Sequence, residues 1–204
     1  IELKDEWDVD ELSEYILKYK RTLIRAKFPG SGKSYVCEDL VKMGYNVLFV
    51  CPTNRLAQKY KSRGITTNKF FGVGFKKEDK EENDNGGNMV LQRFDHSEYN
   101  IIVFDEIYFS SIRMLAKIRK FCLDNPDKIV VATGDTSQLP PVAPYTNTKD
   151  YTTYADECIN TIFPYEIYLK ENKRLKTKED RDRLEQIYND IFSKDIPLRK
   201  TIKT

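Results

Sequence analysis

Apolar positions along the chain follow two spacings, one typical of buried strands and one typical of amphipathic helices. Strands are predicted at the short apolar runs 22–26, 47–51, 101–104, 128–132 and 167–169. Apolar residues three or four positions apart predict helices over 10–20, after the glycines near residue 32, after Ser110 and near the C-terminus. This alternation predicts an α/β fold, a mostly parallel β-sheet with helices on both faces.

Four predicted helices carry recognisable end signals. Gly44 is expected to end the helix that places Val36, Leu40 and Met43 on one face. Ser110 is expected to cap the helix that turns Ile112, Leu115 and Ala116 inward. Residues 52–54 open another helix, and residues 177–180 have the pattern of a capping box.

The segment 76–88 (KKEDKEENDNGGN) breaks the alternation. It is polar, charged and glycine-bearing, which is typical of an exposed loop or a hairpin tip. A tolerated surface insertion explains the segment equally well.

Composition and charge exclude several classes of protein. The 13 Tyr, 11 Phe and 1 Trp among 204 residues exclude disorder over the whole chain. A net charge of +2 excludes a polybasic mode of nucleic-acid binding, so any such contact must use a local groove. No apolar run approaches the ~18 residues of a membrane span, and we expect no membrane association.

The cysteines argue against metal and disulfide chemistry. Cys37, Cys51, Cys122 and Cys158 form no C-x-x-C pair, and His96 is the only histidine, so a zinc site is not expected. Scattered single cysteines suit an intracellular, reducing compartment.

A glycine-rich segment at 27–34 (KFPGSGKS) stands between a predicted strand and a predicted helix. Glycine lets backbone N–H groups approach a phosphate chain, and the N-terminus of the next helix adds a positive dipole. The pattern predicts a phosphate loop in which Lys33 reaches the β- and γ-phosphates and Ser34 ligates Mg²⁺. Lys27 stands where the usual pattern has its first glycine, and a fortuitous glycine turn is the alternative.

An acidic pair, Asp105 and Glu106, directly follows the run 101–104. The carboxyl end of a central strand is where open α/β sheets bind ligands. Asp105 is expected to hold Mg²⁺, and Glu106 to orient the attacking water. A solvated acidic pair at a strand end is the alternative.

A third motif, GDTSQLPPV at 134–142, follows the next apolar strand. The amide of Gln138 can sense a γ-phosphate, and the two prolines stiffen the exit of the loop. A turn without function would explain the Gly-Asp and Pro-Pro pairs, but not their place at a third strand end.

In this order, the three motifs resemble motifs I, II and III of superfamily 1 helicases. The third is similar to the form found in the 1B branch, the RecD-like and Dda-like DNA helicases. Residues 50–54 (VCPTN) resemble motif Ia, and residues 67–72 (TNKFFG) resemble the T-x-H-x-F segment, with Lys69 in place of the usual His. Residues 169–174 (LKENKR) resemble motif IV. The resemblance covers about residues 20–192.

The resemblance implies a RecA-like P-loop NTPase domain that hydrolyses ATP with Mg²⁺ to move on single-stranded DNA. The implied catalytic residues are Lys33, Asp105, Glu106, Gln138 and Arg174, the last reaching the γ-phosphate. The implied nucleotide site adds Pro29, Gly30, Ser31, Gly32 and Ser34, and the implied metal ligands are Ser34 and Asp105. The implied nucleic-acid contacts are Pro52, Thr53, Asn54, Thr67 and Lys69. Phe70 or Phe71 is expected to stack on bases or, alternatively, to pack in the core.

Residues 1–204 are expected to form a single RecA-like domain, helicase domain 1A. The segment 73–99 stands where the 1B branch carries a small hairpin, and nothing resembles motifs V and VI of the second RecA-like domain. The chain begins with Ile1 and not Met. We therefore expect a fragment, monomeric and weakly active alone. A viral-type superfamily 1 RNA helicase and a P-loop interaction module with little hydrolysis remain as alternatives.

Overall fold

The computed structural model describes residues 9–26, 32–73, 92–135 and 148–169, together with residues 182, 183 and 186. The helices are α1 (Val9–Tyr19), α2 (Lys33–Lys42), α3 (Asn54–Lys59), α4 (Thr67–Phe71), α5 (Ile112–Asp124) and α6 (Thr148–Ile162), with 3₁₀ turns η1 (Lys61–Arg63) and η2 (Ile107–Phe109). The strands are β1 (Arg21–Ala26), β2 (Val47–Cys51), β3 (Gly64–Thr66), β4 (Ile101–Phe104), β5 (Ile129–Gly134) and β6 (Tyr165–Leu169).

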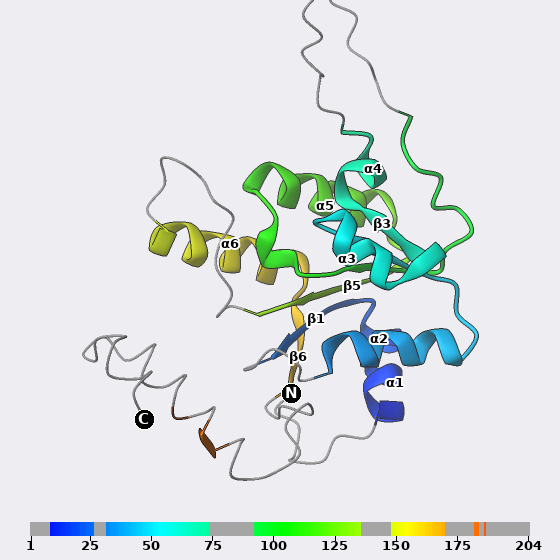
Figure 1. Ribbon diagram of the computed structural model, residues 1–204, viewed down its shortest axis with the longest axis horizontal. Coiled ribbons are helices and arrows are strands. Elements are labelled where there is room, and N and C mark those ends of the chain that lie inside the picture. The colour runs from blue at the N-terminus through cyan, green and yellow to red at the C-terminus, as the bar shows by residue number, and fades with distance from the viewer. Residues whose placement is uncertain are drawn as a thin grey trace, which may run out of the picture.

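The strands form one sheet in the order β3-β2-β4-β5-β1-β6, and every pairing is parallel (Figure 1). The predicted α/β fold with a mostly parallel sheet is therefore confirmed. The five predicted strands are all present, while the short edge strand β3 was not predicted.

Helices cover both faces of the sheet. Side chains of α4, α5 and α6 pack on one face, and side chains of α1, α2 and α3 pack on the other. Alternate residues of each strand point to opposite faces, so on β2 Leu48 and Val50 enter the first cluster while Val47, Phe49 and Cys51 enter the second. Burial on both faces explains why these strands are continuously apolar.

The predicted end of α2 is confirmed. Gly44 has φ +93°, its N–H donates to the carbonyl of Val41, and the N–H of Tyr45 donates to the carbonyl of Leu40. These two bonds define a Schellman motif, which needs a left-handed residue at this position. The expectation that Met43 joins the apolar face was wrong, because Met43 follows the last helical turn and is 48% exposed.

The predicted cap of α5 was wrong by one residue. Ser111 accepts the N–H of Met114, while Ser110 ends the 3₁₀ turn η2. Leu115 and Ile118 are buried and Ile112 is partly buried, but Ala116 is exposed. The inward face therefore continues from Leu115 to Ile118 and Phe121.

One arginine ties the end of α5 to the start of β5. The guanidinium of Arg21 donates to the carbonyl oxygens of Lys128, Cys122 and Asn125 at 2.5, 2.9 and 2.8 Å. The last carbonyls of a helix lack partners within the helix, so Arg21 satisfies groups that water would otherwise have to reach.

None of the described helices is long and apolar enough to cross a membrane. The predicted loop at 76–88 and the predicted capping box at 177–180 lie outside the described residues.

Candidate nucleotide-binding site

The three predicted motifs begin at one edge of the sheet. They follow β1, β4 and β5, which lie side by side in the order β4-β5-β1. Because these strands are parallel, their carboxyl ends meet at the same edge. Residues 27–31 of the first motif and 136–142 of the third lie outside the described residues.

Helix α2 begins directly after a glycine of the predicted phosphate loop. Gly32 caps the helix with φ +90°, a left-handed conformation that side chains rarely adopt. The N–H groups of Tyr35 and Val36 turn back to the carbonyl of Gly32. Lys33 follows as the first helical residue and is 8% exposed. Lys33 is therefore buried at the amino-terminal end of the helix.

Asp105 is fixed by two hydroxyl groups. Its side chain is 5% exposed. Thr133 donates to Oδ1 at 2.5 Å, and Tyr60 donates to Oδ2 at 2.8 Å. Two donors to a buried carboxylate satisfy the charge and fix its orientation.

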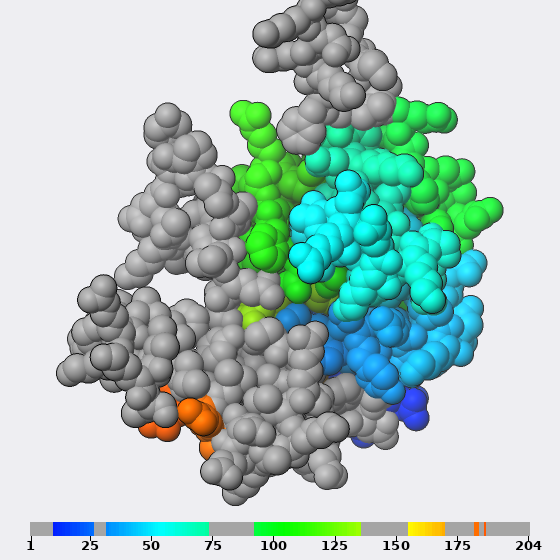
Figure 2. Space-filling model, in the orientation of Figure 1, coloured from blue at the N-terminus to red at the C-terminus, as the bar shows by residue number. Residues whose placement is uncertain are grey.

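Tyr60 also links Asp105 to the phosphate loop. Its hydroxyl oxygen lies 3.0 Å from Ser34 Oγ, and Lys59 Nζ donates to the same Ser34 Oγ at 3.0 Å. Burial first, and then the charge of Asp105, raise the pKa of Tyr60, so the phenol keeps its proton. The ring of Tyr60 stacks on Phe49 with centroids 3.9 Å apart. The helices that carry these groups, α2 in blue and α3 in cyan, adjoin on the face seen in Figure 2.

Glu106 adopts a left-handed conformation, φ 53° and ψ 51°. Its N–H donates to Thr133 Oγ1 at 3.3 Å, so Thr133 holds both members of the acidic pair. A left-handed conformation in a residue other than glycine costs on the order of 1–3 kcal/mol and is typical of functional sites.

The loop after β4 is packed tightly against β5 and α6. A Cβ atom at Gly134 would lie 2.5 Å from the ring of Tyr108, so only glycine fits there. The hydroxyl of Tyr108 donates to Asp156 at 2.6 Å, and Asp156 lies 3.7 Å from Arg25. The glycine of the third motif thus has a packing reason within this fold.

The residues at this edge fit Mg²⁺. Asp105 and Ser34 offer a carboxylate and a hydroxyl, both within hydrogen-bond distance of one oxygen, that of Tyr60. Mg²⁺ prefers oxygen ligands and is often held by one or two protein groups plus water and phosphate. No cluster of three or more His, Cys, Asp or Glu side chains with the arrangement of a metal site occurs among the described residues.

The predicted nucleic-acid contacts lie at the starts of α3 and α4. Thr53 caps α3 by accepting the N–H of Leu56, and both Thr53 and Asn54 are exposed. Lys69 is exposed, whereas Thr67 is 8% exposed and donates its hydroxyl to the carbonyl of Cys51. The structure therefore gives Thr67 a structural hydrogen bond, and the five contacts stay a prediction.

The structure brings some predicted site residues together and does not describe others. Lys33, Ser34, Asp105 and Glu106 lie at one edge, whereas Pro29, Gly30, Ser31, Gln138 and Arg174 lie outside the described residues. Sequence reasoning missed Lys59, Tyr60 and Thr133, because nothing in their spacing relates them to Ser34 or Asp105.

Comparison with known proteins agrees with this arrangement. Residues 26–199 match the family described as the viral superfamily 1 RNA helicase core domain. No curated protein matches the chain at a significant level.

Several solved structures are similar. One contains two coordinating Pif1 helicases that unwind forked double-stranded DNA (TM-score 0.62, 20% identity, 96% of this chain and 50% of that one). Another is the Pif1 helicase of Candida albicans (TM-score 0.61, 20% identity, 93% and 44%). A third is the Bacteroides Pif1 helicase in complex with ADP-AlF3 and ssDNA (TM-score 0.57, 20% identity, 90% and 47%). The likeness establishes the fold, and the chain spans about half the length of these structures.

Proposed function

Because the chain belongs to the viral superfamily 1 RNA helicase core domain family, we propose that it is the nucleotide-binding motor domain of an ATP-dependent helicase that moves on single-stranded DNA. The observation that carries the proposal is the contact of Ser34 and Asp105 through Tyr60. It joins the helix after β1 to the end of β4, and so brings the two groups proposed to hold Mg²⁺ to one place at the sheet edge.

The described residues divide the chemistry between them. Lys33 binds the β- and γ-phosphates, and Ser34 and Asp105 hold the metal. Mg²⁺, when bound, neutralises charge on the phosphate oxygens. Glu106 orients the attacking water and accepts its proton. The left-handed backbone of Glu106, anchored through its N–H to Thr133, fixes where that side chain starts.

Gln138 and Arg174 complete the proposed site. Gln138 senses the γ-phosphate and Arg174 neutralises its charge as the bond breaks. A second RecA-like domain would supply the other wall of the cleft and the rest of the strand track. In this proposal residues 1–204 form the first RecA-like domain, which carries the 1B-like insertion at 73–99.

Thr53, Asn54 and Lys69 are the proposed contacts to the strand, with Pro52 and Thr67 shaping the same edge. Contacts of this kind reach the backbone and are tolerant of sequence. We favour DNA because the Pif1 structures named above act on or bind DNA. RNA is the second candidate, favoured by the description of the matching family.

Calorimetry with ADP and Mg²⁺ tests the nucleotide site. Filter binding of DNA and RNA strands of identical sequence tests the proposed binding of a single strand. We expect nucleotide binding that depends on Mg²⁺ and a preference for DNA. A preference for RNA would favour an RNA helicase. If the chain binds nucleotide but neither DNA nor RNA, a P-loop interaction module would be the better interpretation.

The same chain should fail to separate a forked duplex in the presence of ATP and Mg²⁺. One domain has nothing to close against, and translocation needs closure around the nucleotide. Strand separation by this chain as a monomer would contradict the proposed division into two domains. We further propose a reducing, intracellular compartment, which is supported by the four free thiols.

A further inference from the structure

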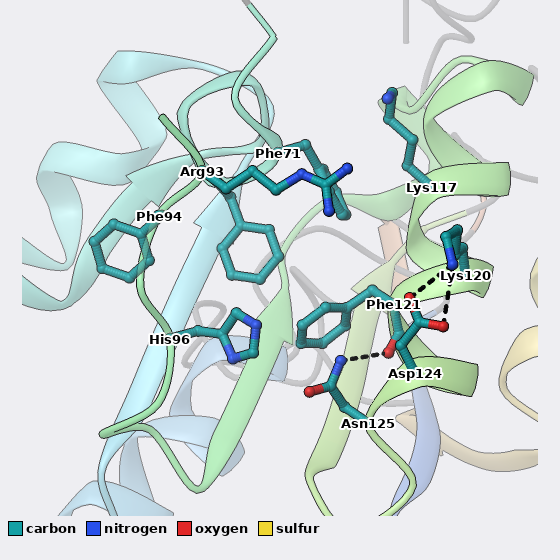
Figure 3. Close-up of a pocket in the computed structure, with 10 residues that line it drawn as sticks. Phe71, Arg93, Phe94, His96, Lys117, Lys120, Phe121, Asp124 and Asn125 are labelled. Carbon is teal, nitrogen blue, oxygen red and sulfur yellow. Dashed lines mark hydrogen bonds and ion pairs between the residues drawn. The ribbon is translucent and has the colours of Figure 1, made fainter. Parts of the chain in front are cut away.

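A cavity of about 230 Å³ opens between α4, α5 and the extended segment 92–96 (Figure 3). It lies on the sheet face covered by α4, α5 and α6. None of Lys33, Ser34, Asp105 and Glu106 lines it. The cavity is therefore separate from the proposed nucleotide site.

Aromatic rings make the walls of this cavity. Phe71 and Phe94 are only partly buried and line the opening, while Phe70 and Phe121 pack beneath them. The ring of His96 meets Phe121 edge to face, with centroids 5.0 Å apart. Rings in such an arrangement offer π-faces and edges to a flat ligand.

The rim of the cavity is positively charged. Arg93 and Lys117 are exposed lining residues that stand on opposite sides, Arg93 on the segment 92–96 and Lys117 on α5 (Figure 3). Lys120 is already paired with Asp124, at 2.9 Å. Because that pair is neutral as a unit, Arg93 and Lys117 give the opening its net positive charge.

The floor offers polar atoms at the edge of a bound ring. The amide nitrogen of Asn125, a lining residue, donates to the carbonyl of Phe121 at 2.9 Å, which leaves its Oδ1 as an acceptor (Figure 3). Burial first, and then the charge of Lys128, lower the pKa of His96 below its ordinary value. The imidazole is therefore neutral near pH 7, and its ring adds no charge to the floor.

We propose that this cavity holds one nucleobase of a nucleic-acid strand, with the adjoining phosphate at Arg93 and Lys117. The proposal rests on the proposed function, because it assumes that the chain binds such a strand. The volume is below the ~300–1,000 Å³ of pockets for drug-sized ligands, so it suits a single flat ring system. Stacking on aromatic side chains combined with a basic rim is how proteins bind single strands without reading sequence.

The position of the cavity favours a strand over a peptide. Helix α4 carries Lys69, a proposed strand contact, directly before Phe70 and Phe71. Lys117 lies in the amino-terminal half of α5, the end that follows the acidic pair at the sheet edge. The proposed strand contact Lys69 and the cavity residues Phe70 and Phe71 therefore share one short helix. An apolar peptide side chain would not need the two cations.

The test compares an oligonucleotide with a matched strand that has one abasic position, by fluorescence anisotropy on the whole chain. Phe94→Leu keeps apolar volume but removes the π-face. We expect it to weaken binding of the intact strand by about 10-fold and to leave the abasic strand unchanged. Lys117→Ala should weaken both strands and reduce the salt dependence of binding. A 4-thiothymine strand should crosslink to the cavity residues, as located by mass spectrometry.

Two matched controls lie on α5 outside the cavity, Arg119→Ala for Lys117 and Leu123→Ala for Phe94. Both residues are exposed, and both variants should bind like the parent chain. Equal loss of the intact and abasic strands in Phe94→Leu, or no loss, would overturn the proposal while leaving strand binding in place. If the parent chain binds no strand at all, the proposed function itself fails. Tight binding of a mononucleotide at this cavity, measured with Lys33→Ala to silence the other site, would overturn the strand as the occupant.

Discussion

The hydroxyl of Tyr60 donates a hydrogen bond to Asp105 Oδ2 at 2.8 Å. Tyr60 is the C-cap of α3 and precedes Asp105 by 45 residues in the chain. The same oxygen lies 3.0 Å from Ser34 Oγ. Tyr60 thus stands between the two groups proposed to hold Mg²⁺. A metal that takes both as direct ligands must replace these hydrogen bonds.

The first prediction follows from that competition. Tyr60→Phe keeps the stack on Phe49 but removes the hydroxyl. We expect the free energy of unfolding to fall by about 1–2 kcal/mol, because Asp105 loses a buried donor. We also expect half-saturation of nucleotide binding at a lower Mg²⁺ concentration, since no hydroxyl has to be displaced. Urea unfolding and calorimetric Mg²⁺ titration measure the two effects.

Tyr45→Phe is the matched control, since Tyr45 packs against the same cluster of buried residues. It should change neither quantity measurably. If Tyr60→Phe raises the Mg²⁺ requirement, Tyr60 positions Asp105 for the metal and does not compete with it.

The second prediction concerns Lys33. Lys33→Ala should weaken Mg²⁺-nucleotide binding by about 100-fold or more, because a lysine to phosphate contact is a charge-assisted hydrogen bond in a buried setting. Calorimetry with ADP measures the loss. Lys42→Ala, at the other end of α2, should leave binding intact. Unchanged affinity in Lys33→Ala would exclude the phosphate-loop assignment.

The third prediction concerns Glu106. Glu106→Gln keeps the shape of the side chain and removes its charge. In a protein that carries both RecA-like domains, we expect nucleotide binding to be retained and turnover to fall by about 100-fold or more, the scale of a lost general base. Steady-state hydrolysis and nucleotide titration separate the two. Near-normal turnover would show that another group orients the water.

The fourth prediction concerns the anchor at the end of α5. Arg21→Met should lower the free energy of unfolding by about 2–3 kcal/mol, because three carbonyl groups lose a charged donor. Urea unfolding provides the measurement. Arg119→Met, on the exposed side of α5, should change stability by less than ~0.5 kcal/mol. An equal effect of the two variants would mean that the three hydrogen bonds of Arg21 make no measurable contribution to stability.

The fifth prediction is alkaline instability. Burial raises the pKa of Cys51 from 9.0 to about 12 and that of Cys122 from 9.0 to about 11. Between about pH 9 and 11 the unfolded chain has lost protons that the folded chain still holds. Stability should therefore be unaffected by these thiols below pH 9 and fall above it, by about 1.4 kcal/mol per pH unit for each thiol.

Urea unfolding at pH 8, 9 and 10 checks this slope. Cys122→Ala removes one of the titrating groups, so its decline between pH 9 and 10 should be shallower than that of the parent chain. Identical slopes in the two proteins would show that Cys122 is not one of the groups responsible.

The strands were predictable because central parallel strands are buried on both faces. Runs such as Ile101–Phe104 are then apolar at every position. The edge strand β3 escaped because only Ile65 of its three residues is buried. The order of the strands could not be predicted either, since each pairing joins distant parts of the chain.

The candidate site was predictable where chemistry concentrates in short motifs. Lys33, Ser34, Asp105 and Glu106 stand beside strand ends that periodicity locates. The roles of Tyr60 and Thr133 were not predictable, because each residue acts through a contact that only the folded sheet creates. The cap at Ser111 was missed for a local reason: two serines are adjacent, and the turn η2 takes up the first.

The strand order also decides when the protein can fold during its synthesis. β1 is made before the other described strands, yet its neighbours are β5 and β6, with Arg21 opposite Val130 and Thr22 opposite Tyr165. Its apolar residues Leu23 and Ile24 therefore cannot be fully buried by neighbouring strands until β6, the last described strand, has been made. Such non-local pairing slows folding and leaves apolar surface open to aggregation. A nascent chain stalled before β6 would be a natural client for a chaperone.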